Sequence, residues 1–394
     1  MSDPLANALI IDGHADTAQR FVDEGWDFTG PLTTPQNSGG MLNLASARAG
    51  NLAAEFFAIW VDPTQFPPSA YAQRARTLIH AVQDQVRRHP ADLALCTSPA
   101  DILAAQASGR FAMLLGIEGG HAIENSLDRL REYYDLGVRY MTLTWINSND
   151  WAESSTDLRD PARRDSSDPS SPPPGLTPFG HEVIAEMNRL GMMIDLSHSS
   201  DRTFADVLAA TRPPVIASHS SARALTNSPR NLTDDQLRAL ATNGGVCMVN
   251  FFSPFIDENY RLAWAAQRGE RSAAHVALAQ DFAARNQPVP FHISNRIDLE
   301  FAARIPRPPL SSLIDHFDHI IHIAGVDHVG IGTDFDGISS LPQGIDSAAD
   351  LPKVTEALLA RGYCADDLRK VLADNLMRVF AAVESHAAKE KREP

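Results

Sequence analysis

Eight short apolar runs, spread along most of this chain, limit the folds that it can adopt. Each run is about as long as a β-strand, and none alternates strictly between apolar and polar residues, which indicates strands covered on both faces. Amphipathic segments with a helical period separate the runs, for example at 71–88 and 178–190. The runs occupy residues 8–11, 54–60, 111–117, 139–144, 192–196, 214–217, 246–251 and 328–332.

Eight strands that alternate with helices predict an α/β fold, a (β/α)8 TIM-type barrel, with residues 1–394 as a single catalytic domain. The competing fold is a doubly wound open sheet, which would favour a glycine-rich turn after its first strand. Gly13 alone does not supply that turn. The sequence therefore favours the barrel.

Two segments interrupt the predicted alternation of strands and helices. Residues 159–177 are polar and rich in proline, and we expect an exposed loop there. Residues 254–309 form a longer insertion between the seventh and eighth predicted strands, with a helical pattern at 259–285. We expect this insertion to be a lid or small subdomain on the barrel.

The overall charge and the cysteine content exclude some classes of partner. A formal net charge of −15 disfavours nucleic acid, because an acidic surface repels phosphate backbones. The three cysteines, Cys96, Cys247 and Cys364, are widely spaced and offer no disulfide framework. No signal peptide, membrane anchor or membrane-spanning run is recognisable. We therefore expect a cytoplasmic protein.

Five polar residues that can bind metal follow four of the apolar runs. In a barrel the carboxyl ends of all strands meet at one mouth, so we expect these side chains to converge there. Histidine and carboxylate donors suit Zn²⁺. Five donors are too many for one tetrahedral ion with an open position, and they suit two ions bridged by a carboxylate and a hydroxide. The candidate ligands are His14, Asp16, Glu118, His198 and His219.

A second group of histidines has a different spacing. His316, His319 and His322 recur every third residue in a predicted helix at 311–324. A three-residue step drifts around a helix, so these three side chains cannot share one ion, and we expect them at the surface or at the rim of the barrel.

Six short motifs occur in a fixed order and resemble those of a known family. They are IDGHADT at 11–17, GIEGGH at 116–121, IDLSH at 194–198, ASHSSA at 217–222, RN at 230–231 and GIGTDFDG at 330–337. This set resembles the membrane (renal) dipeptidase family of binuclear zinc peptidases, within the amidohydrolase-like barrels. The resemblance extends from about residue 8 to about residue 380 and is weakest in the two interrupting segments.

The resemblance implies a role for each candidate ligand and an activity for the protein. His14 and Asp16 would hold one zinc, His198 and His219 the other, and Glu118 would bridge both together with a hydroxide. Each subunit would thus bind two Zn²⁺. The implied activity is hydrolysis of dipeptides, with either L- or D-residues at the C-terminal position, by a protein that forms homodimers.

The resemblance also implies roles for residues that do not bind metal. Arg230 would grip the terminal carboxylate of the dipeptide, as a bidentate fork can, and Asp334 would carry the proton. One position departs from the family, because Trp145 stands where well-studied members have a histidine that polarises the substrate carbonyl. An indole N–H donates one hydrogen bond but cannot become a cation. We expect Trp145 and Asn147 to contact the substrate, with Asn147 or Asn149 as the replacement donor.

Two alternatives stay open at the level of sequence. One is a binuclear metal amidohydrolase that acts on another amide, such as an N-acyl amino acid. Arg230 favours a substrate with an anionic end but does not exclude these amides. The other is a catalytically inactive barrel that serves as a binding protein, and Trp145 is its only support.

Overall fold

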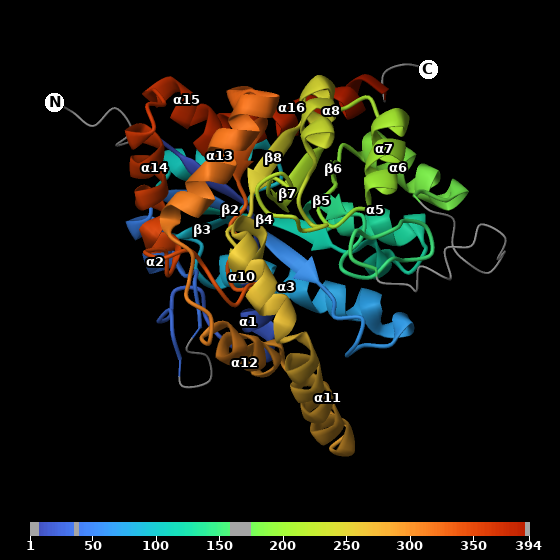
Figure 1. The fold of residues 1–394 in the computed structure, drawn as a ribbon. Coiled ribbons are helices and arrows are strands. Elements are labelled where there is room, and N and C mark those ends of the chain that lie inside the picture. Colours follow the sequence, from blue (N-terminus) through green and yellow to red (C-terminus); the bar gives the residue numbers. More distant parts are fainter. Residues whose placement is uncertain (1–7, 35–38, 158–174, 391–394) are drawn as a thin grey trace.

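The computed structural model describes residues 8–34, 39–157 and 175–390 (Figure 1). At its centre is a closed ring of eight parallel strands, one for each of the eight apolar runs. The predicted proline-rich loop at 159–177 lies outside the described residues, except at 175–177. The strands are β1 (Ile10–Ala15), β2 (Leu52–Trp60), β4 (Phe111–Glu118), β5 (Val138–Thr142), β6 (Met193–Asp195), β7 (Ile216–Ser220), β8 (Val246–Val249) and β9 (Val329–Ile331).

The pairing of the strands confirms the predicted barrel. Going around the ring, the order is β1, β9, β8, β7, β6, β5, β4 and β2, and the β2–β4 pairing closes the ring. One further strand, β3 (Leu93–Leu95), pairs with β4 and was not predicted from the sequence. This strand is only three residues long, too short for a pattern of apolar residues to stand out.

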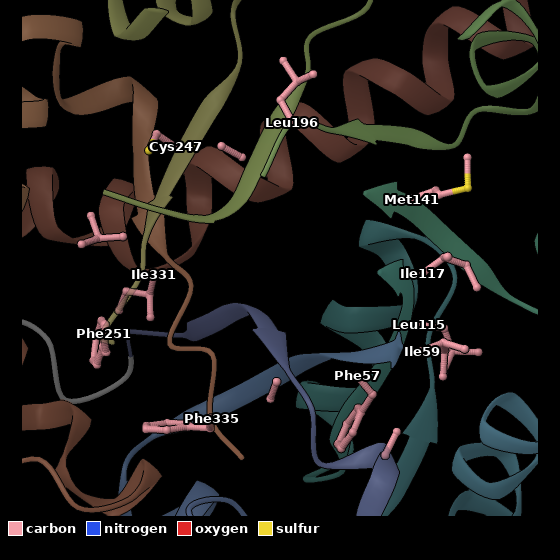
Figure 2. Close-up of a cluster of buried hydrophobic side chains, with 14 of the residues drawn as sticks. Phe57, Ile59, Leu115, Ile117, Met141, Leu196, Cys247, Phe251, Ile331 and Phe335 are labelled. Carbon is pink, nitrogen blue, oxygen red and sulfur yellow. The ribbon is translucent and has the colours of Figure 1, made fainter. Parts of the chain in front are cut away.

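The strands carry apolar side chains on both faces, as continuous apolar runs predict. Phe57, Ile59, Leu115 and Ile117 belong to the layer between the barrel and its helices (Figure 2). Residues of the opposite parity point into the barrel, where Phe56 packs on Tyr140 with 5.1 Å between the ring centroids.

Helices surround the ring and close its amino-terminal end. The last helix, α16 (Asn375–Glu390), closes that end, with Phe380 packed on Phe56 at 6.3 Å. The others are α1 (Ala18–Asp23), α2 (Leu44–Ala49), α3 (Tyr71–Arg88), α4 (Pro99–Ala107), α5 (Leu127–Asp135), α6 (Pro178–Leu190), α7 (Asp201–Ala210), α8 (Asp234–Asn243), α13 (Leu310–Ala324), α14 (Leu351–Ala360) and α15 (Ala365–Arg369).

The local sequence explains where several helices begin and end. Helix α8 begins at a capping box in which the Thr233 side chain accepts from the Gln236 backbone, and it ends at Gly244 in the left-handed region. Helix α13 presents an apolar face to the barrel, and this face includes His316. Its imidazole is fully buried and accepts a hydrogen bond from the Ala222 backbone at 3.0 Å. The expected position at the surface or at the rim of the barrel is therefore wrong for His316.

The insertion between β8 and β9 is helical. It comprises α9 (Ser253–Ile256), α10 (Glu258–Ala266), α11 (Arg268–Ala284) and α12 (Phe291–Ala302). Helix α11 projects away from the barrel, and none of its residues is buried (Figure 1). Helix α12 returns to the barrel beside α1. Within the described residues, no helix is long and apolar enough to cross a membrane.

Candidate metal centre

The five candidate ligands converge at the carboxyl end of the barrel, as predicted from the strand ends. His14 lies in β1 and Asp16 directly after it, Glu118 is the last residue of β4, and His219 lies in β7. His198 follows β6 and has a positive φ of 66°. All five side chains are buried, with at most 7% of their surface exposed.

The carboxylate of Glu118 lies between two sets of histidines. Its Oε2 faces His14 Nε2 at 3.4 Å, whereas its Oε1 faces His198 Nε2 at 3.0 Å and His219 Nε2 at 3.6 Å. Each carboxylate oxygen thus belongs to a different cluster of donors. This is the arrangement expected of a carboxylate that bridges two cations.

Hydrogen bonds fix the tautomer of two of the histidines. The Tyr140 hydroxyl donates to the Gly13 carbonyl at 3.1 Å, so the contact of 2.8 Å between Tyr140 and His14 Nδ1 assigns the proton to Nδ1. In the same way, Ser218 donates to Asp195, and His219 Nδ1 donates to Ser218 Oγ at 2.8 Å. The Nε2 lone pairs of both imidazoles are therefore directed into the site, as metal ligation requires.

Several of the donor atoms are buried without a hydrogen-bond partner among the described residues. Among the atoms that face the cluster, these are His14 Nε2 and Asp16 Oδ1. Such atoms carry a desolvation cost unless a ligand compensates it. Two trios of residues bring one ligand atom each to within 4.8 Å of one another: His14 with Glu118 and His219, and His14 with Asp16 and Asp334. The residues therefore fit bound cations.

The electrostatics of the site also indicate cations. Burial and then the positive charge of Arg230 lower the pKa of His198 to about 3, which keeps its imidazole neutral and able to ligate. Burial raises the pKa of Asp334 to about 8, and the negative charges of Asp16 and Glu118 add to this effect. A cation among these carboxylates would offset their repulsion and favour their ionised forms.

Asp334 is held at the edge of the donor cluster by its backbone and by one side-chain partner. It has a φ of 64°, in the left-handed region, and its backbone N–H donates to the His14 carbonyl at 3.0 Å. Asn250, at the end of β8, donates from Nδ2 to Asp334 Oδ2 at 2.9 Å. A Cβ at Gly337 would lie 2.1 Å from Asp16 Oδ2 and 2.6 Å from Asp334 Oδ1, so any other residue there would displace these carboxylates.

Arg230 extends into the same site from the segment after β7. The residue is 4% exposed, and its guanidinium donates from Nη2 to the His219 carbonyl at 3.1 Å. It lies 5.4 Å from the centroid of the Phe255 ring and makes no ion pair with any described residue. Its Nε has no hydrogen-bond partner in the described part of the chain. A buried, unpaired guanidinium is well suited to an anionic ligand.

A pocket opens onto the donor cluster, and its lining includes most of the predicted site residues. Trp145 lines it, whereas Asn147 does not and donates instead to the Ser148 carbonyl at 3.4 Å. Asn149 donates to the Leu143 carbonyl at 2.8 Å and is likewise outside the lining. The full lining is Asp16, Trp60, Glu118, Trp145, His198, Arg230, Phe252, Phe255, Phe291, Asp334, Gly337 and Ile338.

The phenylalanines of this pocket were not predicted from the sequence. Phe252 and Phe255 follow β8, and Phe291 is the first residue of α12 in the insertion. No local motif marks them, because their contribution depends on how the insertion packs on the barrel. The only signal was the position of the insertion, directly after a strand whose end faces the mouth.

Comparison with known proteins gives relatives along almost the whole chain. Dipeptidase 3 of Rattus norvegicus is 33% identical over 375 residues, which cover 95% of this chain but 65% of the rat protein. A metallo peptidase from Rhodobacter sphaeroides, solved with a phosphinate mimic of the dipeptide L-Ala-D-Ala, is 26% identical with a TM-score of 0.74, covering 96% of this chain and 99% of that one. A probable dipeptidase from Pseudomonas aeruginosa is 25% identical with a TM-score of 0.77, covering 97% of both chains.

The match to a family model is equally extensive. The model for the membrane dipeptidases, peptidase family M19, covers residues 2–394, which includes all of the strand ends that form the donor cluster. Together with the geometry of Glu118 and its histidines, this match shows that the chain belongs to the membrane dipeptidase family.

Proposed function

We propose that this protein is a zinc-dependent dipeptidase that binds two Zn²⁺ per subunit. The observation that carries the proposal is the position of the Glu118 carboxylate, which directs one oxygen toward His14 and the other toward His198 and His219. Beside it lies the buried, unpaired guanidinium of Arg230. The family match and the relative solved with a dipeptide mimic support the same activity.

Arg230 supports a substrate with a terminal carboxylate. Burial lowers the pKa of its guanidinium only to about 10, so the group is still a cation at neutral pH. A carboxylate that accepts from this guanidinium would offset the cost of burying its charge. The same contact would place the amide of a short substrate over the donor cluster, which turns binding energy into orientation.

The remaining residues supply the groups that amide hydrolysis needs. Bound Zn²⁺ ions would supply positive charge for the developing oxyanion and would lower the pKa of a water held between them from about 15.7 toward about 7. Asp334, fixed by Asn250, would accept the proton of that water and pass it to the leaving amine. The ligand side chains are almost fully buried, and the lower dielectric constant there strengthens each of these interactions.

Metal reconstitution tests the proposal directly. The protein is stripped with a chelator, reloaded with Zn²⁺, analysed for metal content and assayed against L-Xaa-L-Xaa and L-Xaa-D-Xaa dipeptides. We expect about two Zn²⁺ per chain and hydrolysis that depends on them. Glu118→Gln should lose both the metal and the activity. Glu300→Gln, on the exposed side of α12, should keep both.

Each contrary outcome favours a different alternative. If the protein binds zinc and hydrolyses N-acyl amino acids but no dipeptide, the proposed metal centre stands and the proposed substrate class is wrong. Protein that takes up no zinc and hydrolyses neither class of amide would overturn the proposed enzymatic activity and favour a binding barrel.

A further inference from the structure

The aromatic residues of the pocket form two groups on opposite sides of the mouth. Trp60 ends β2, and Arg230 follows β7. In the ring of eight strands, β2 and β7 are separated by three strands in either direction, so these two residues face each other across the barrel axis. Phe255 lies with Arg230, whereas Trp145 and Phe291 lie with Trp60.

The group opposite Arg230 is continuous. The Trp60 ring lies 4.7 Å from the Trp145 ring at 56°, and 5.7 Å from the Phe291 ring at 70°, between centroids. We call these three side chains the aromatic wall. None of the three carries a charge. The Trp60 indole Nε1 is buried without a hydrogen-bond partner among the described residues.

The insertion contributes Phe291 to the wall through fixed contacts with the barrel. The Phe291 backbone N–H donates to Asp23 Oδ2 at 3.0 Å, and Asp23 forms an ion pair with Arg74 at 2.8 Å. Two residues earlier, the Val289 backbone donates to Gln65 Oε1 at 3.1 Å. These anchors set the position of the Phe291 ring, so the size of the pocket depends on a residue outside the barrel.

We propose that the aromatic wall binds the side chain of the N-terminal residue of the dipeptide and selects large apolar or aromatic side chains there. The inference rests on the proposed function, because Arg230 fixes the C-terminal carboxylate. The scissile carbonyl then lies over the donor cluster, and the side chain of the residue that carries it extends away from Arg230 toward Trp60. Aromatic rings stabilise such a side chain through buried apolar area and ring–ring contacts.

The test compares substrates that differ only in their N-terminal residue. Zinc-loaded protein is assayed with Phe-Ala, Leu-Ala, Ala-Ala and Gly-Ala, and with the reversed dipeptides Ala-Phe and Ala-Leu. We expect kcat/KM to rise with the size of the N-terminal side chain, by about 10-fold or more from Gly-Ala to Phe-Ala. The reversed dipeptides should show a weaker dependence on size.

Variants of Phe291 connect the preference to the wall. Phe291→Ala should lower kcat/KM for Phe-Ala by about 10-fold and change that for Gly-Ala by less than about 3-fold. Phe291→Trp, which narrows the pocket, should shift the preference toward smaller N-terminal side chains. The control is Val276→Ala, a similar truncation on exposed α11, and it should leave the preference unchanged. Metal content and thermal unfolding show whether each variant is intact.

The outcomes separate this inference from the proposed function. Dipeptide hydrolysis with a flat preference, or with a preference that Phe291→Ala and Phe291→Trp leave unchanged, would overturn the role of the wall alone. A preference confined to the C-terminal residue would also overturn it. Absence of hydrolysis of every dipeptide by zinc-loaded protein would overturn the proposed function, and with it this inference.

Discussion

The two sides of the pocket are built from different parts of the fold. The donor cluster consists of side chains at or just after barrel strands, held by hydrogen bonds from buried neighbours such as Tyr140 and Ser218. The aromatic side combines Trp60, at the end of β2, with loop residues and with Phe291 of the insertion, which contacts with Asp23 and Gln65 hold in place. The barrel therefore places the chemical groups, whereas the added segments determine the shape that surrounds a substrate.

The contrast between the two sides indicates where changes should matter most. Substitutions at the strand ends should act on turnover, because these residues are fixed by neighbouring strands and contact the reacting groups. Substitutions on the opposite side should act on the choice of substrate. Two substitutions outside the aromatic wall probe this division, and a third, away from the mouth, tests the stability of the barrel; they follow in order of decreasing effect.

The greatest loss is expected for Asp334→Asn. The amide keeps the shape of the side chain but cannot accept the proton, so kcat should fall by about 10²- to 10⁴-fold. The measurement combines steady-state kinetics with metal analysis, and we expect the zinc content to be unchanged. Loss of zinc together with activity would make Asp334 a ligand instead of a proton carrier. Near-normal turnover would remove it from the chemistry.

A more moderate effect is expected for Arg230→Lys, which keeps the charge but removes the bidentate fork. KM for dipeptides should rise by about 10-fold or more, while kcat changes less. Dipeptide amides, which lack the terminal carboxylate, provide the control. Wild-type protein should bind them poorly, and the substitution should weaken that binding little further. An equal loss with both kinds of substrate would contradict the assigned contact.

The weakest of the three effects concerns a buried carboxylate of the barrel that lies away from the mouth. Glu55 on β2 is in register with Asp12 on β1, and neither of its carboxylate oxygens has a hydrogen-bond partner among the described residues. Burial, and then the negative charge of Asp12, raise the pKa of Glu55 well above its ordinary value. Asp336 adds to this effect, and His14 opposes it.

Glu55→Gln should therefore stabilise the protein increasingly as the pH rises. The folded wild type keeps a proton that the unfolded chain releases, so its stability falls from a pH of about 4.3 up to the raised pKa. The substitution removes this loss, which amounts to about 1.4 kcal/mol for each tenfold difference in proton affinity between the folded and unfolded states. Thermal unfolding from about pH 5 to about pH 8 measures it, with the exposed Glu300→Gln as the control. A difference from wild type that is constant with pH would contradict a raised pKa.

The barrel and the donor cluster could be predicted from the sequence because both follow from local patterns. Each apolar run marks a strand, and the rule that strand ends share one mouth brings His14 close to His198 without further information. Asn250 was also recognisable as a polar residue at a strand end, but its hydrogen bond to Asp334 required the structure.

The aromatic side could not be predicted, because it depends on packing between distant segments. Phe291 contacts Trp60 only because the insertion folds back onto α1. No local sequence pattern predicts this contact between the insertion and the barrel. The burial of His316 was missed for a similar reason, since its partner is a backbone group in another segment. The homodimer and the cytoplasmic location stay predictions.

The order in which the ring closes bears on how the protein is made. Strand β1 carries His14, but its neighbour β9 and Asp334 are encoded near the other end of the chain. While the protein is being synthesised, the first donors emerge long before the strand that completes their surroundings, and domains generally fold as units once their sequence is available. The donor cluster is therefore complete only when β9 has joined the ring, so the proposed metal site forms last, after almost the whole chain has been made.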